Sequence, residues 1–230
     1  MLHSADDQRF STPAFTAMKG AGSIVSIDDS ASVEDLTLGL DWTQWLLRSV
    51  RQRCAGVILP EQPSLAALAK VWPAWLTGMF IPRLGPFLLR CADVANRQSH
   101  EELANHEQRW AAMLNADEAM RSARAGAQLL RSVKGARHAG ALILLQEACA
   151  AGAIKGHIGL VWPAVASLFQ LSPGVMLAEY LRLEFHCAGR RLAGLSEDAF
   201  RPAMVQTVQK LLSDQTLPWR DGSEAMDLPV

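Results

Sequence analysis

The chain has 230 residues, half of them hydrophobic and one fifth charged, and its formal net charge at pH 7 is −1. This length suits one sizeable domain better than two small ones, and the composition is that of a globular protein and not of a disordered chain. The near-zero net charge excludes a protein drawn to nucleic acid or to anionic membranes by its overall charge.

The first half of the chain is predicted to be helical, apart from "SIVSI" at 23–27, a weak strand candidate. In "DWTQWLLRSVRQRC" (41–54), Asp41 is a plausible N-cap, and apolar side chains form one stripe. The next predicted helix, 64–80, contains Pro73, which should end or kink it because proline lacks the N–H of a regular helix. A further helix over 86–98 opens with a proline.

The second half begins with a helical stretch over 100–133, which is divided near "NADE", where Asn115 and Glu118 have capping-box spacing. The clearest helix start is Ser172, a capping residue that Pro173 follows. Other helices are predicted over 141–153, over 157–170, where Pro163 starts or bends the helix, and near 200–214. We therefore predict one all-α domain over 23–214, a helical bundle, with a flexible segment at 1–22 and a flexible tail at 215–230.

Four widely spaced cysteines lie in apolar stretches without a CxxC pair, at positions 54, 91, 149 and 187. This pattern is typical of reduced, buried thiols in a cytosolic protein. The polar, acidic sequence "MLHSADDQRF" is not typical of a signal peptide. The longest uncharged run, 158–176, is broken by Pro163 and "SPG", which predicts two buried helices and no membrane span.

Catalytic motifs are not found in the sequence, which has no glycine-rich phosphate loop, no HExxH and no GxSxG. The six histidines are scattered, and no nucleophile, base and orienting group occur together. We expect Glu179, Arg182 and Glu184 to form surface pairs at turn spacing. The chain is therefore predicted to be no enzyme and to bind no metal or cofactor directly.

The segment "MRSARAGAQLLRSVKG" (120–135) combines four basic residues with small ones. It could be a phosphate-binding surface, a place where two helices pack closely, or a docking face for another protein. Ser122 and Gly126 are one turn apart, and a glycine inside a helix costs about 1 kcal/mol relative to alanine. Close approach of another helix would offset that cost. No aromatic side chains are interleaved with the charges, which disfavours nucleic acid.

The same segment resembles the urease accessory protein UreF family. The resemblance rests on "EAMRSARAGAQLL", with Glu118, Arg121, Ser122, Gly126, Leu129 and Leu130 in step with a family signature. A second block begins at His157 and continues through "AEYLRLEFHCAGRRLAGLSE", where Tyr180, Leu181, Arg191, Leu192 and Leu195 keep register. The chain departs from the family at Gly194, Ser196 and Glu197 and in the N-terminal "TPAFTAMKGAG", and 55–85 looks like extra sequence.

The resemblance implies an all-α, non-catalytic cytoplasmic homodimer that helps to insert nickel into apo-urease. Such a protein bridges apo-urease, the accessory GTPase and a third accessory protein. Nickel and GTP are then held mainly by the GTPase. Because termini of family members help to bind the third accessory protein, the tail with Trp219 is expected to take part in partner binding.

The residues assigned to partner binding or to shaping the interface are Arg121, Arg124, Gly126, Tyr180 and Arg191, together with Trp219. Simpler roles remain open for most of them. Arg121 and Arg191 could form internal salt bridges, Gly126 could serve helix packing, and Tyr180 could be partly buried with a satisfied hydroxyl.

Two other functions also remain open. The chain could be a helical adaptor for assembly of another metalloenzyme or of a secretion complex, with tryptophans 42, 45, 72 and 75 as its binding face. It could instead be a regulator that binds nucleic acid through 121–138.

Overall fold

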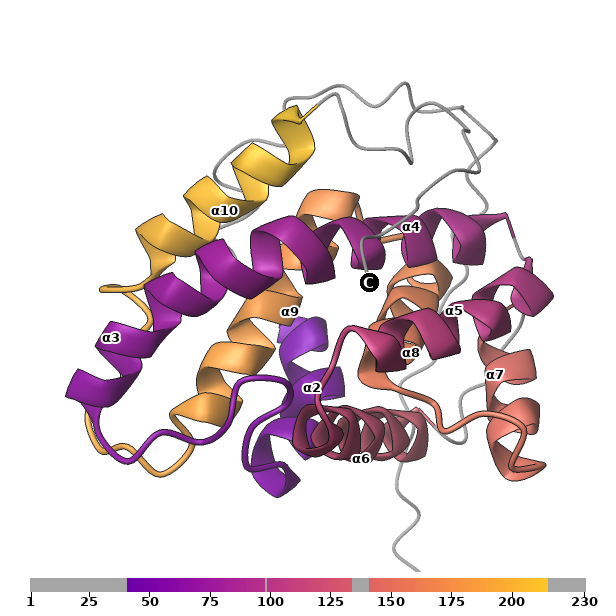
Figure 1. The fold of residues 1–230 in the computed structure, drawn as a ribbon, viewed down its shortest axis with the longest axis horizontal. Helices are drawn as coiled ribbons and strands as arrows, with labels where there is room; N and C mark the ends of the chain where they lie inside the picture. The colour runs from indigo at the N-terminus through magenta and orange to yellow at the C-terminus, as the bar shows by residue number, and fades with distance from the viewer. Residues whose placement is uncertain (1–40, 98, 134–140, 215–230) are drawn as a thin grey trace, which may run out of the picture.

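The computed structural model describes residues 41–97, 99–133 and 141–214. The helices follow one another in this order: α2 (Asp41–Arg53), α3 (Leu65–Trp75), η1 (Leu76–Leu84), α4 (Gly85–Asn96), α5 (His100–Ala112), α6 (Ala116–Ser132), α7 (Ala141–Ala150), α8 (Ile158–Leu168), α9 (Pro173–Ala188) and α10 (Arg201–Ser213) (Figure 1). The described residues contain no β-strand, only an isolated bridge between Gly56 and Pro60. The all-α prediction is confirmed.

The helices α3, η1 and α4 form one continuous helical stretch, which crosses the molecule in Figure 1. Pro73, which was predicted to end or kink the helix, lies inside α3 and faces solvent, so it does not end the helix. The stretch continues as η1, a π-helix that contains Pro82, and the N–H of Gly85 donates to the carbonyl of Phe80, five residues earlier. In a π-helix each N–H bonds to the carbonyl five residues earlier instead of four. Because this shifts the pairing of carbonyls near Pro82, which has no N–H to donate, the helix continues through that proline.

The core lies where α8 and α9 meet the other helices. α8 is buried along almost its whole length and packs against α4 and α6, while α9 packs against α2 and α10. The predicted start of α9 is confirmed, because the hydroxyl of Ser172 accepts the N–H of Val175 at 3.3 Å. The prediction of two buried helices over 158–176 and beyond is confirmed as well.

By length and composition alone, one described stretch, Leu65–Asn96, could cross a membrane. It has 32 residues, and its most apolar 18-residue window has a mean hydropathy of 1.2, with 28% of that window buried inside the protein. One such helix is weak support for a membrane span, because core helices of soluble proteins meet the same criterion.

The tryptophans of α3 point into the protein. Trp72 is fully buried, stacks on Trp75 with ring centroids 5.4 Å apart, and meets the edge of the Phe185 ring at the same distance. Trp72 is therefore a core group and not part of a binding face, and Trp75 is partly buried against the core. The side chains of Trp42 and Trp45 lie outside the described part.

The cysteines follow the sequence prediction closely. All four are free, three are buried, and Cys149 is half-buried. The segments predicted at 1–22, 23–27 and 215–230 lie outside the described residues.

Candidate functional site

The helix α6 carries three of the six predicted site residues and begins at the predicted cap. The side chain of Asn115 accepts the N–H of Glu118 at 3.0 Å, and the Glu118 carboxylate accepts the N–H of Asn115 at 2.9 Å. This reciprocal capping box satisfies two N–H groups that a helix start leaves unpaired. It fixes where α6 begins and therefore which residues face the core.

Gly126 marks a close crossing between α6 and the segment that leads into α8. A Cβ atom at this position would lie 1.9 Å from the carbonyl oxygen of Gly156 and 2.9 Å from backbone atoms of His157 and Ile158. One turn earlier, the hydroxyl of Ser122 is buried and accepts the indole N–H of Trp110 at 2.9 Å. The Ser–Gly spacing thus serves close packing within the chain, as the sequence predicted, although the partner is a loop and the end of a helix.

Arg121 holds α6 to the loop that follows α2. Its guanidinium donates to the carbonyl oxygen of Ile58 at 2.8 Å, so it forms a hydrogen bond to the backbone and not the salt bridge considered from the sequence. The same loop is held from the other side by Glu184, whose carboxylate accepts the N–H groups of Ile58 and Leu59, each at 3.1 Å.

Tyr180 belongs to this buried arrangement, because its hydroxyl donates to the Glu184 carboxylate at 2.9 Å. Its side chain is fully buried, so the expectation of partial burial was wrong and that of a satisfied hydroxyl is confirmed. Burial raises the pKa of Glu184 to about 7, and the hydrogen bonds from Tyr180, Ile58 and Leu59 and the charge of Arg121 oppose that rise. Tyr180 cannot touch a partner in this fold; it positions the loop.

A second glutamate holds the loop that crosses Gly126. The carboxylate of Glu107 accepts the N–H of Lys155, and its Oε1 lies 3.8 Å from Nε2 of the buried His157. Burial raises the pKa of Glu107, while burial, followed by the charge of Lys155, lowers the pKa of His157 to about 4. Both contact loops of α6 are therefore fixed by buried carboxylates.

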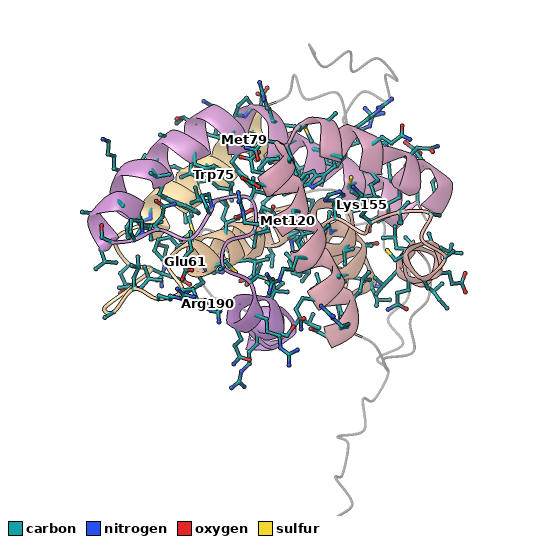
Figure 2. The ribbon with its side chains drawn as sticks, turned by 60° about the horizontal axis from the view of Figure 1, so that its bottom comes forward. Glu61, Trp75, Met79, Met120, Lys155 and Arg190 are labelled. Carbon is teal, nitrogen blue, oxygen red and sulfur yellow. The ribbon has the colours of Figure 1, made fainter. Side chains whose placement is uncertain are left out.

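The outward side of α6 is different in character. Arg124 and Arg131 are exposed, and Met120, on the same stripe, is 64% exposed, the largest value among the exposed large hydrophobic side chains of the described residues. Arg190, just after α9, lies on the same side of the molecule (Figure 2). The buried side of α6 carries uncharged residues, whereas its exposed side carries arginines. Their guanidinium groups can bind carboxylates or phosphates of a partner.

Arg191 directly follows Arg190 in the chain. Its Nε is 3.4 Å from Oε1 of Glu61, but its side chain is 77% exposed. The salt bridge considered from the sequence is thus present, although an exposed pair of this kind contributes little stability. Trp219 lies outside the described residues.

Ionic groups on α9 are buried, contrary to the surface pairs that the turn spacing suggested. Arg182 contacts Glu179 on its own helix and Glu197 at 3.3 Å, and His186 contacts Glu197 as well. Glu179 and Glu184 have 1% or less of their area exposed. The predicted pair of Glu179 and Arg182 at turn spacing is therefore present, but the expectation that it lies on the surface was wrong. Glu184 bonds instead to a tyrosine hydroxyl of its own helix and to the loop after α2.

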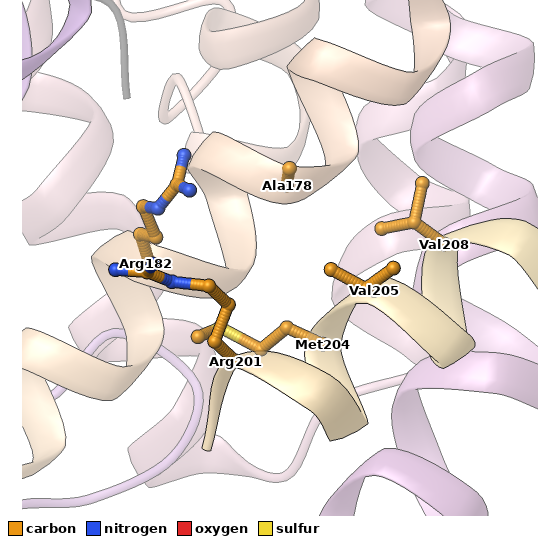
Figure 3. Close-up of a pocket in the computed structure, with 6 residues that line it drawn as sticks. All are labelled: Ala178, Arg182, Arg201, Met204, Val205 and Val208. Atoms are coloured by element: carbon orange, nitrogen blue, oxygen red, sulfur yellow. The ribbon is translucent and has the colours of Figure 1, made fainter. Parts of the chain in front are cut away.

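A small cavity of about 10 Å³ lies between α9 and α10, next to Arg182 and Arg201 (Figure 3). The other side chains that line it are aliphatic. This volume is about that of one water-sized probe, so the cavity has no room for a substrate.

A more open groove of about 520 Å³ lies between α6 and α7. Its lining is mostly apolar and includes Leu130, Ile143 and Cys149, with Arg131 and Glu147 among the residues around it. Within the described residues, no three His, Cys, Asp or Glu side chains are placed to hold a metal ion.

Comparison with protein-family models, with curated proteins and with solved structures gave no match for this chain. What the site can do therefore follows from its own geometry.

Sequence reasoning missed the two loop-holding glutamates, Glu107 and Glu184. A signal for the second was present, because Glu184 lies in a helix whose other positions are apolar on nearly every side, so a charge there had to be buried. For Glu107 no such signal exists, since the acidic sequence around it suggested a solvated helix.

Proposed function

We propose that the protein is a non-catalytic cytoplasmic scaffold, similar to UreF, that assists insertion of nickel into apo-urease. In this role it acts as a homodimer and bridges the accessory GTPase, the third accessory protein and apo-urease. Nickel and GTP are substrates and ligands of the GTPase, and this chain contributes surfaces.

One observation carries the proposal. The residues on which the resemblance rests determine the shape of α6 and its surroundings: Ser122 and Gly126 permit the close crossing, and Leu129 is fully buried. Because these residues fix the packing, their match to the UreF pattern supports a similar architecture. A match confined to solvated residues would give no such support. The partner surface itself rests on exposed groups, chiefly Arg124 beside Met120. Arginine and methionine are both enriched at protein interfaces.

The test is co-purification of the full chain with the accessory GTPase and the third accessory protein, with and without nickel. We expect both partners to be retained and urease activity to be lost when the gene is deleted.

Arg124→Ala should lower the amount of partner retained about tenfold, the effect of a strong interface residue. Arg83→Ala is the matched control, because Arg83 is also an exposed arginine but lies on η1. Deleting residues 215–230, with Trp219, should weaken retention of the third accessory protein.

Retention of neither partner, together with full urease activity in the deletion strain, would refute the proposal. If the chain instead binds duplex DNA with a steep dependence on salt, the nucleic-acid alternative gains support.

A further inference from the structure

The open groove between α6 and α7 has a helix as each of its walls. Both helices pack against α8, and the loop that leads into α8 touches both walls. A Cβ atom added at Gly156 in that loop would lie 2.5 Å from the sulfur of Cys149 and 3.4 Å from Cδ1 of Leu130. The groove volume of about 520 Å³ is far more than a bound water needs and lies in the range of ligand sites.

The residues that line the two walls recur at helical spacing. They form one stripe on each helix: Ala127, Leu130 and Arg131 on α6, and Ile143, Glu147 and Ala150 on α7. Residues at positions i, i+3, i+4 and i+7 lie along one face of a helix, and helices pack on one another through such faces. Ile143 is 40% exposed, so an apolar stripe of this kind faces solvent here.

Each wall carries one charged residue, and the two charges are opposite. Arg131 of α6 and Glu147 of α7 are both exposed, and neither forms an ion pair with another described residue. Glu147 is the only charged residue of α7, whereas α6 also has the exposed Arg124 two turns before Arg131. The groove therefore has an apolar lining, a positively charged α6 side and a negatively charged α7 side.

These walls suit a helix better than an extended peptide. An extended peptide needs partners for its backbone N–H and C=O groups, and α6 and α7 use theirs in their own helical hydrogen bonds. A helix pairs its own backbone groups and fills a groove with side chains. If both edges of that helix had the same charge, one of them would face a like charge, at either Arg131 or Glu147.

We propose that the groove between α6 and α7 binds an amphipathic helix of a partner protein. The apolar stripe of that helix fills the groove, its acidic edge faces Arg131, and its basic edge faces Glu147. The opposite charges select the partner, as charges beside the apolar seam do in coiled coils. Since α7 takes no part in the resemblance to UreF, the inference does not depend on the proposed role in urease maturation.

The first experiment measures binding of three designed helical peptides to the full chain by fluorescence anisotropy. In each peptide leucines recur at i, i+3, i+4 and i+7. The edges of the leucine stripe carry glutamate on one side and lysine on the other in the mixed peptide, glutamate on both sides in the acidic one, and lysine on both sides in the basic one. The mixed peptide can match Arg131 and Glu147 in one of its two directions. The wild type should bind it about fivefold more tightly than the other two, the effect of one exposed ion pair.

Reversing one charge of the groove should change which peptide is preferred. Arg131→Glu makes both sides negative and should favour the basic peptide, whereas Glu147→Lys makes both sides positive and should favour the acidic one, each by about fivefold. Ile143→Asp should weaken binding of every peptide about tenfold, because it places a charge in the apolar lining. Leu65→Asp is the matched control, because Leu65 is also 40% exposed but lies on α3.

The thiol of Cys149 gives a second readout, which locates the bound peptide. Cys149 lines the groove and is half-buried, whereas the other three cysteines are buried. The bound mixed peptide should slow alkylation of Cys149 by iodoacetamide about fivefold, as measured by mass spectrometry, because it covers the thiol. Circular dichroism checks that each variant is folded.

Failure of all three peptides to bind overturns the proposal, as does an order of affinities that is the same for the wild type and both charge variants. Peptide binding that leaves the alkylation rate of Cys149 unchanged also overturns it. So does self-association of the wild type that Ile143→Asp and each charge reversal abolish, because a second copy would then occupy the groove.

Discussion

Gly126 and Gly78 both lie in helical backbone, but a methyl group added to each would meet different surroundings. At Gly126 it would overlap the carbonyl oxygen of Gly156, whereas at Gly78 no atom of another part of the chain lies within 4 Å. The overlap at Gly126 involves backbone that is itself held by Glu107, so it cannot be relieved by rotating a side chain.

We expect Gly126→Ala to lower the free energy of unfolding by about 2 kcal/mol or more, because overpacking costs outweigh the gain of about 1 kcal/mol in helix propensity. Gly78→Ala should raise it by up to about 1 kcal/mol. Urea unfolding of both variants measures the two changes. Similar midpoints for the two variants would contradict the close crossing.

At the scale of elements, two loops and one helix depend on each other. Glu184 fixes the loop after α2, Glu107 fixes the loop before α8, and α6 touches both through Arg121 and Gly126. The loops carry no regular hydrogen-bond ladder, so buried carboxylates supply partners for their N–H groups.

Glu184 should make the stability of the protein depend on pH. Its pKa in the folded chain is about 7, above the ordinary value of 4.5, so the folded state holds a proton that the unfolded state releases between these values. The contribution to stability is fully present below about pH 4.5 and is lost as the pH rises through about 7. Relative to Glu184→Gln, the wild type should lose of order 3 kcal/mol of unfolding free energy between pH 4.5 and pH 8.

Urea unfolding across this pH range measures the effect, with Glu147→Gln, an exposed carboxylate on α7, as the matched control. Parallel pH profiles for the wild type and Glu184→Gln would show that Glu184 does not titrate in this range.

The sequence predicted what depends on neighbouring residues and missed what depends on distant ones. The cap of α6 and the start of α9 were found because Asn115, Glu118 and Ser172 bond to backbone within three residues. Buried charges on α9 were missed because Glu184 meets residues more than 120 positions away. In the site, the packing role of Gly126 was predictable, whereas the bonds of Arg121 and Glu184 to the loop after α2 required the fold that joins α2, α6 and α9.

At the scale of the whole molecule, thiol reactivity reports global unfolding. Cys54 is buried in the loop after α2, Cys91 on α4 and Cys187 on α9, while Cys149 borders the groove between α6 and α7. Burial, together with the charge of Glu107, raises the pKa of Cys149 to about 11, so even this thiol should react slowly.

With an uncharged alkylating reagent at pH 8, Cys149 should be modified first, and the other three should follow at the rate of unfolding. Mass spectrometry over time, with and without urea, distinguishes the two phases. Modification of Cys91 before Cys149 in native buffer would contradict the packing of α4.

The π-helix η1 sets the rotational phase between α3 and α4. Since the two helices share one uninterrupted backbone, every residue in between rotates α4 relative to α3, by about 100° in α-helical geometry and by less in the wider π turns. Deleting a single residue such as Gly78 would therefore swing Phe87, Leu88 and Cys91 out of the interior without removing any of their side chains. Length variation in this stretch should be far less tolerable than substitution, although much of its surface faces solvent.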